Sequence, residues 1–133
     1  MTARQYQWHI GAAMDFDVAI DHGLHYVRVT IHGPVAIEQL LAMIHLLGVE
    51  SEAWPAPRIL VDLRGVATPF TRPEQFRIGA AAAASLSHME KIASLVPTER
   101  VTRVSERAAQ RDGANLLVFD DEPAAIAWLR AED

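Results

Sequence analysis

The chain has 133 residues, of which 50% are hydrophobic and 22% charged, and its length fits one domain spanning residues 1–133. The formal charge of −5 disfavours nucleic acid as a partner, because phosphate binding needs a basic surface. The absence of cysteine excludes disulfides and thiolate chemistry. We recognise no leader peptide and no membrane-spanning run, so we expect a cytoplasmic protein with no membrane span.

The N-terminal segment alternates between apolar and polar residues. Tyr6, Trp8 and Ile10 are separated by glutamine and histidine, and Gly11 then interrupts the pattern. Alternation with period two is typical of a strand, but this stretch is short. Residues 1–13 therefore predict either an N-terminal arm or an extra short strand.

Two further alternating segments predict a β-hairpin. Val18 and Ile20 alternate with acidic residues, and Val27 and Val29 alternate with polar ones, on either side of a turn at residues 22–23. After Gly33 and Pro34, apolar residues recur at helical spacing and predict a helix. They are Ile37, Leu40, Leu41, Ile44 and Leu47.

The rest of the chain alternates between short apolar runs and amphipathic segments. We predict strands at 58–63, 92–96 and 116–119, and helices at 71–87, at 98–113 and from Asp120 or Asp121 onward. The order β-β-α-β-α-β-α-β-α predicts an α/β fold. It contains a single-layer mixed five-stranded sheet with four helices, in which the first strand is antiparallel and the rest are mainly parallel.

The predicted strands at 58–63, 92–96 and 116–119 are apolar on both faces. We therefore expect the second sheet face to be covered by the N-terminal arm, a helix, a second copy of the chain or an apolar ligand. The loops after Leu63, Val96 and Phe119 should share one sheet edge, where α/β proteins tend to bind ligands.

The start of the helix at 71–87 carries a capping-box pattern. The hydroxyl of Thr71 can accept from the amide of Glu74, whose carboxylate reaches back to the start of the helix. A hydroxyl at a helix N-terminus is also a favourable phosphate acceptor, so Thr71 and nearby Thr68 are candidate modification sites. We favour the capping role, because the pattern already accounts for Thr71.

Acidic residues and histidines give no catalytic or metal-binding set. Asp62, Asp120 and Asp121 follow strands, where carboxylates can bind Mg²⁺ or transfer protons. We favour structural roles, because Arg64 lies close to Asp62 and the other two precede a helix. Six histidines lack convergent spacing: His9, His22, His25, His32, His45 and His88. We therefore predict no metal, no cofactor and no enzymatic activity.

Four arginines fall on one arc of the predicted helix at 98–113: Arg100, Arg103, Arg107 and Arg111. A basic stripe on an acidic protein would suit an acidic partner or a phosphate-bearing ligand. The alternative, which we favour, is a solvated face on which Glu99 and Arg103 pair one helical turn apart.

Two segments carry a family resemblance: RILVDLRGV at 58–66 and VFDDEPAAIAWL at 118–129. With the hairpin-first order, residues 16–129 resemble the STAS-like superfamily, and most closely its SpoIIAA-like (STAS/SEC14-type) branch. The resemblance implies a mixed five-stranded sheet with right-handed crossovers in a bacterial regulatory domain.

The better-known members of this superfamily are bacterial anti-sigma-factor antagonists. The resemblance implies partner binding through the loop after the third strand and the following helix N-terminus. In those proteins, phosphorylation of a serine in a D-S-S-G-like motif abolishes binding. Here Phe70, Thr71, Arg72 and Pro73 occupy the four positions, and this departure argues against the phospho-switch.

The resemblance implies a non-enzymatic domain that docks a protein partner, such as a regulatory kinase or a sigma-factor regulator. The candidate partner-binding or phospho-switch residues are Asp62, Arg64, Thr68, Thr71 and Arg72. The related CRAL-TRIO (SEC14-like) type binds lipid-like ligands. The alternative is therefore a carrier or sensor of a small apolar ligand, with a closed cavity beneath residues 79–84. A homodimer is compatible with either function.

Overall fold

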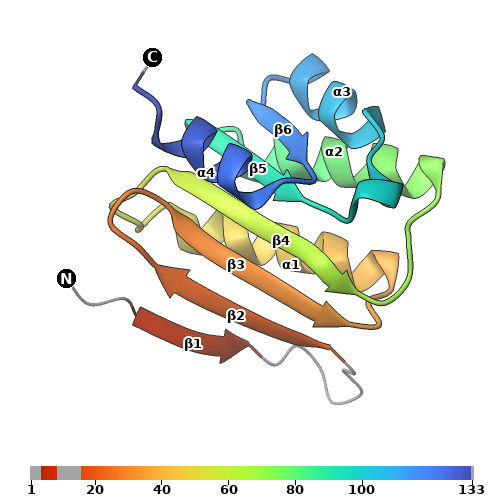
Figure 1. Ribbon diagram of the computed structural model, residues 1–133, viewed down its shortest axis with the longest axis horizontal. Coiled ribbons are helices and arrows are strands. Elements are labelled where there is room, and N and C mark those ends of the chain that lie inside the picture. The colour runs from red at the N-terminus through yellow and green to blue at the C-terminus, as the bar shows by residue number, and fades with distance from the viewer. Residues whose placement is uncertain (1–3, 9–15, 133) are drawn as a thin grey trace.

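The computed structural model describes the backbone of residues 4–8 and all of residues 16–132. Six strands form one sheet in chain order (Figure 1). They are β1 (Arg4–Trp8), β2 (Asp17–His22), β3 (Val27–Gly33), β4 (Arg58–Val66), β5 (Lys91–Leu95) and β6 (Leu116–Phe119). The β1–β2 and β2–β3 pairs are antiparallel, and the other pairs are parallel.

The predicted fold class is confirmed, with one addition at the edge of the sheet. The five expected strands are present, and residues 4–8 add a sixth strand beside β2. The sequence left two alternatives for residues 1–13, an arm or an extra short strand, and residues 4–8 form the strand. Residues 1–3 and 9–13 lie outside the described part of the chain.

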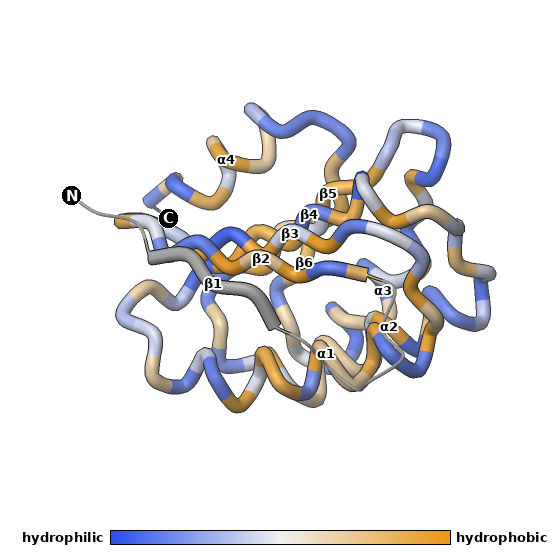
Figure 2. Tube along the Cα trace, turned by 90° about the horizontal axis from the view of Figure 1, so that it is seen from below, coloured by the Kyte–Doolittle hydropathy of each residue, from blue (hydrophilic) through white to orange (hydrophobic). Residues whose placement is uncertain are grey.

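The sheet carries helices on both faces. On one face lie α1 (Ile37–Ser51), α2 (Arg72–Leu86) and α3 (Val104–Arg111), and α4 (Glu122–Arg130) lies alone on the other (Figure 2). The main core fills the space between the sheet and the first group of helices. Its strand side chains alternate, as the hairpin pattern predicts, and Val18, Ile20 and Val29 are fully buried. Within the described residues, no helix is long and apolar enough to cross a bilayer.

The second sheet face is covered by a helix of the same chain. Leu60 of β4 and Leu95 of β5 form a smaller core with Ala125 and Leu129 of α4. The apolar pattern of the parallel strands is therefore explained by α4, one of the expected covers. Over β2 and β3 the same face is more polar, and Arg28 there contacts the N-terminal end of α4.

Small residues allow α2 to pack closely against both neighbouring helices. A Cβ atom at Gly48 of α1 would lie 2.5 Å from the Ser85 carbonyl oxygen of α2. A Cβ atom at Gly79 of α2 would lie 2.3 Å from the Ser105 carbonyl oxygen of α3. The small-residue segment of α2 thus serves helix packing, because any side chain at these two glycines would force the helices apart.

The predicted helix at 98–113 is wrong in its first half. Residues Thr98–Arg100 form a short 3-10 turn, η1, and α3 begins only at Val104. The chain is extended at Val101, and the hydroxyl of Thr102 accepts the Val104 amide at 3.4 Å, so this β-branched pair interrupts the helix. The end of α3 follows the prediction, since Gly113 has a φ of 101° and closes the helix.

Candidate functional site

A loop at residues 67–71, hereafter the 67–71 loop, joins β4 to α2 at the carboxyl edge of the parallel strands. The junction of β4 with the loop is held from two sides. The Ala67 amide donates to the Gly33 carbonyl oxygen at 2.9 Å, and the Arg100 guanidinium donates to the Val66 carbonyl oxygen at 2.7 Å. The predicted strand at 58–63 accordingly extends to Val66, where β4 still pairs with β3.

The end of the loop is fixed by the start of α2. The Thr71 hydroxyl accepts from the Glu74 amide at 3.3 Å, and the Thr71 amide donates to the Glu74 carboxylate at 2.8 Å. The predicted capping box is therefore present. Gln75 adds a hydrogen bond of 2.8 Å from its side-chain amide to the Phe70 carbonyl oxygen. The loop backbone is anchored at both ends, while the residues at Thr68, Thr71 and Arg72 are exposed.

The loop separates two hollows of the surface. On one side, a cavity of about 210 Å³ lies between α2, α3 and the ends of β4–β6. On the other side, a more open groove of about 470 Å³ leads to the start of α1. Pro69 and Phe70 border both hollows, so the loop forms a ridge between them.

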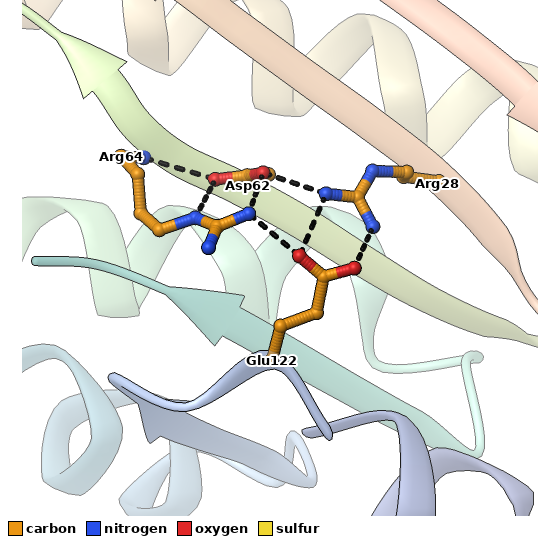
Figure 3. Close-up of polar contacts among 4 residues, drawn as sticks. All are labelled: Arg28, Asp62, Arg64 and Glu122. Carbon is orange, nitrogen blue, oxygen red and sulfur yellow. Dashed lines mark hydrogen bonds and ion pairs between the residues drawn. The ribbon is translucent and has the colours of Figure 1, made fainter. Parts of the chain in front are cut away.

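A ring of four charged side chains lies on the sheet face that α4 covers, between β3, β4 and the start of α4 (Figure 3). Asp62 accepts from Arg28 at 2.7 Å and from Arg64 at 2.9 Å. Glu122 accepts from the same two guanidinium groups, at 3.0 Å from Arg28 and 2.6 Å from Arg64. Each charge therefore has two opposite neighbours, and the ring ties the start of α4 to the sheet.

The ring holds both carboxylates in their charged form. Burial of Asp62 by itself would raise its pKa, but hydrogen bonds from the side chain and backbone of Arg64, with the charges of Arg64 and Arg28, give a net lowering. Hydrogen bonding to Arg28 is the main cause that lowers the pKa of Glu122. Hydrogen bonding to Asp62 raises the pKa of Arg64. Both carboxylates of the ring are paired with arginines, so the arrangement fits a structural role at the contact between α4 and the sheet.

Comparison with known proteins places the fold in a family. A search of curated proteins found no match. The sequence profile of SpoIIAA-like proteins matches residues 26–130, which is most of the chain. The chain belongs to the SpoIIAA-like family.

Two solved structures share the SpoIIAA-like fold. An anti-sigma factor antagonist from Mycobacterium paratuberculosis is 14% identical, with a TM-score of 0.61 over 92% of this chain and 100% of that chain. An uncharacterized protein from the DUF3478 family with a SpoIIAA-like fold, from Shewanella loihica PV-4, is 15% identical, with a TM-score of 0.53 over 91% of this chain and 99% of that chain. Identities this low show a common fold only.

The five candidate partner-binding residues of this SpoIIAA-like domain lie in two separate groups. Asp62 and Arg64 belong to the charged ring on the α4 face. Thr68, Thr71 and Arg72 lie exposed along the 67–71 loop and the start of α2. Among the described residues, no hydrogen bond or ion pair joins the two groups.

The four arginines of the predicted basic stripe do not share one helix. Arg100 lies in η1 and Arg103 precedes α3, so only Arg107 and Arg111 lie on α3 itself. Arg111 pairs with Asp112 at 3.1 Å and lies over the Phe76 ring. Three of the four make side-chain hydrogen bonds within the domain, whereas the Arg107 side chain makes no hydrogen bond or ion pair with any residue in the described ranges.

Arg103 and two α3 residues close the outer edge of β6. Arg103 donates to the Val118 carbonyl oxygen at 3.0 Å, and Glu106 accepts the Val118 amide at 2.9 Å. Gln110 donates to the Leu116 carbonyl oxygen at 3.0 Å. The expected pairing of Glu99 with Arg103 is wrong, since Arg103 instead pairs with Glu106 at 2.9 Å. These side chains occupy backbone groups to which another strand would otherwise bind.

The remaining acidic residues and histidines do not converge. Asp121 stands at the N-cap of α4, but its side chain makes no capping hydrogen bond. His22 contacts the Trp54 ring edge-on, and His88 lies 2.8 Å from the Ser51 hydroxyl. Within residues 16–132, no three histidine, aspartate or glutamate side chains gather as metal ligands.

Sequence reasoning missed two members of the charged ring, Arg28 and Glu122. They lie 94 positions apart, so no local spacing connects them. The parallel pairing of β3 with β4 could have indicated Arg28, because it places Thr30 of β3 opposite Asp62 of β4. Arg28 lies two residues from Thr30 on the same face, directly beside the Asp62 carboxylate.

Proposed function

We propose that this SpoIIAA-like domain is a non-enzymatic regulatory domain that docks a partner protein through the 67–71 loop and the first turn of α2. The observation that carries the proposal is the combination of a fixed backbone with exposed side chains. Arg100, Gln75 and the capping box hold the loop, whereas Thr68 and Arg72 extend into solvent. A loop held in one conformation loses less entropy on binding than a mobile one.

The hollows beside the loop support docking of a folded partner. A ridge bordered by a cavity and a groove gives a partner surface both a projection to surround and depressions to fill. Arg72 has no ion pair with another described residue and is exposed, which suits an acidic group at the rim of the partner. We expect such a partner to be a regulatory protein of the same cytoplasmic compartment.

The size of the closed cavity favours docking over lipid carriage. A lipid carrier needs an enclosed cavity beneath residues 79–84, and the cavity between α1, α2 and the sheet measures about 40 Å³. By comparison, an engineered apolar cavity of about 150 Å³ holds a single benzene molecule. An acyl chain would therefore require a large separation of α2 from the sheet.

Phosphorylation of Thr71 would act on the docking surface by charge. A phosphate would bring roughly two negative charges next to the Glu74 carboxylate, which already accepts the Thr71 amide at 2.8 Å. We infer that the modified loop would rearrange and repel an acidic partner. Native mass spectrometry of the protein from its own host would show whether this phosphate is present.

Site-specific photo-crosslinking in the host cell tests the docking surface. A photoreactive residue at position 68 lies in the loop, and one at position 52, exposed beyond the end of α1, is the matched control. We expect one defined protein to be crosslinked at position 68 and none at position 52. Crosslinking at 52 alone, or at neither position, would contradict the proposal.

A further inference from the structure

The cavity of about 210 Å³ beside the 67–71 loop contains two polar groups that the fold itself does not use. Ser94 of β5 and Ser105 of α3 both line it. Neither hydroxyl makes a hydrogen bond with any residue in the described part of the chain. Among the described residues no buried side-chain polar atom lacks a partner, so both hydroxyls are accessible from the hollow, where they can bond a molecule that enters from outside.

The rest of the lining is largely apolar. Leu63, Val66, Ile78 and Val96 line the cavity from the sheet and α2, and Phe70 closes it from the loop. A volume of about 210 Å³ exceeds the roughly 150 Å³ that accommodates benzene. The cavity therefore has room for one ring with a small substituent, and its walls favour an apolar body.

Charge at the cavity favours an uncharged ligand. Glu99 and Arg100 both line it, and their opposite charges offset each other. The Arg100 guanidinium is also used by the loop, since it donates to the carbonyl oxygens of Val66 and Ala67 at 2.7 and 3.4 Å. A carboxylate or ammonium group would gain no net attraction here and would lose hydration on entry.

We propose that the cavity between α2, α3 and β5 binds a small uncharged ring compound with one hydroxyl or carbonyl group, held by Ser94 and Ser105. The occupied cavity would also fix the docking surface. Phe70 belongs both to the cavity wall and to the 67–71 loop. Its carbonyl oxygen accepts a hydrogen bond from Gln75, and the Gln75 side chain accepts one from Thr102, which also lines the cavity. This regulatory link rests on the proposed docking function, whereas binding itself does not.

Phenol and toluene are matched probes for this site, because they differ by one hydroxyl in place of a methyl group. In a purely apolar cavity phenol binds more weakly than toluene, since its buried hydroxyl stays unpaired. With the two serines as partners, we expect phenol to bind at least as tightly as toluene. Amide NMR spectra of the whole protein should shift at Ser94, Ile78 and Phe70 on titration with phenol.

The variant that carries both Ser94→Ala and Ser105→Ala removes the hydroxyls and keeps the cavity. We expect its phenol affinity to fall about tenfold, with toluene binding unchanged. Ser87→Ala, at the exposed end of α2, is the matched control and should change neither. Should the double variant not fold, Ser105→Ala alone should give a smaller loss of the same kind.

Two results would overturn the proposal. One is the absence of phenol binding to the wild-type protein, and the other is an unchanged phenol affinity in the serine variants. The regulatory link has its own readout in the same spectra, because it requires shifts at the Phe70 and Thr71 amides. Shifts confined to β5 and α3 would overturn the link, whether or not a partner docks at the loop.

Discussion

Lys91 Nζ donates a hydrogen bond of 2.7 Å to the Trp128 carbonyl oxygen in the last turn of α4. The same ammonium donates to the Ala131 carbonyl oxygen at 3.0 Å and lies 5.3 Å from the centre of the Trp128 ring. Lys91 is only 3% exposed. The end of a helix leaves carbonyl groups without partners, and this buried cation satisfies two of them while it fixes α4 on the sheet.

We expect Lys91→Met to lower the free energy of unfolding by about 2 kcal/mol, because it removes two hydrogen bonds that a buried ammonium donates to the end of α4. Arg130→Met is the control, since Arg130 is exposed at the end of the same helix. Urea unfolding would show a change below about 0.5 kcal/mol for the control. An equally small change for Lys91→Met would contradict the role of this contact.

The close approach of α2 and α3 leads us to predict that a side chain at position 79 lowers the stability of the domain. Gly79→Ala would normally stabilise a helix by about 1 kcal/mol. Here the added Cβ would lie 2.3 Å from the Ser105 carbonyl oxygen, so we expect a net loss of about 1–3 kcal/mol. A lowered urea midpoint is the expected result, and a raised midpoint would show that the helices can separate at no cost. Ala84→Gly, at an exposed position of α2, should lose about 1 kcal/mol through helix propensity alone.

The charged ring predicts a pH dependence of stability. The pKa of Asp62 is lower in the folded than in the unfolded protein, so its stabilisation is full above the unfolded pKa of about 3.9. It is lost as the pH falls through the folded pKa. We expect Asp62→Asn to cost about 2 kcal/mol at pH 7, because Asp62 is buried between two arginines.

Unfolding measured from pH 7 down to pH 3 tests the ring. The difference between the wild type and Asp62→Asn should stay constant to about pH 5 and shrink below about pH 4. Asp17→Asn, on the exposed part of β2, is the control and should follow the wild type. A difference that is independent of pH would show that the Asp62 carboxylate contributes nothing by its charge.

The capping box predicts a small effect that depends on the hydroxyl. Thr71→Ala should destabilise the domain by about 0.5–1 kcal/mol, and Thr71→Ser should be nearly neutral, because serine keeps the acceptor for the Glu74 amide. Thermal unfolding of the two variants makes this comparison. Equal loss in both would mean that the methyl group, not the cap, is responsible.

The elements that sequence reasoning predicted are those with a local signal. Val18 and Ile20 alternate with polar neighbours, Thr71 and Glu74 form a capping box, and Gly113 ends α3. Each depends on residues at most a few positions apart. The chain order of these elements then made the sheet and its helices predictable.

The errors arose where distant contacts override a local pattern. The arginine spacing continues from Arg100 to Arg103 as it would in a helix, but Arg100 bonds the carbonyl oxygen of Val66 and Thr102 bonds Gln75. Those bonds hold the chain in a turn and an extended segment. The charged ring, the closed β6 edge and the cavity likewise depend on strand register and helix placement, which no single segment encodes.

The central claim is that a partner protein docks on the 67–71 loop, and one affinity measurement tests it most directly. The partner captured by crosslinking at position 68 would be titrated calorimetrically against the wild type, Arg72→Glu and Arg130→Glu. Both arginines are exposed, and only Arg72 lies at the start of α2 beside the loop. We predict about tenfold weaker binding for Arg72→Glu and less than about a twofold change for Arg130→Glu. Equal affinities for Arg72→Glu and the wild type, or a loss confined to Arg130→Glu, would contradict the account.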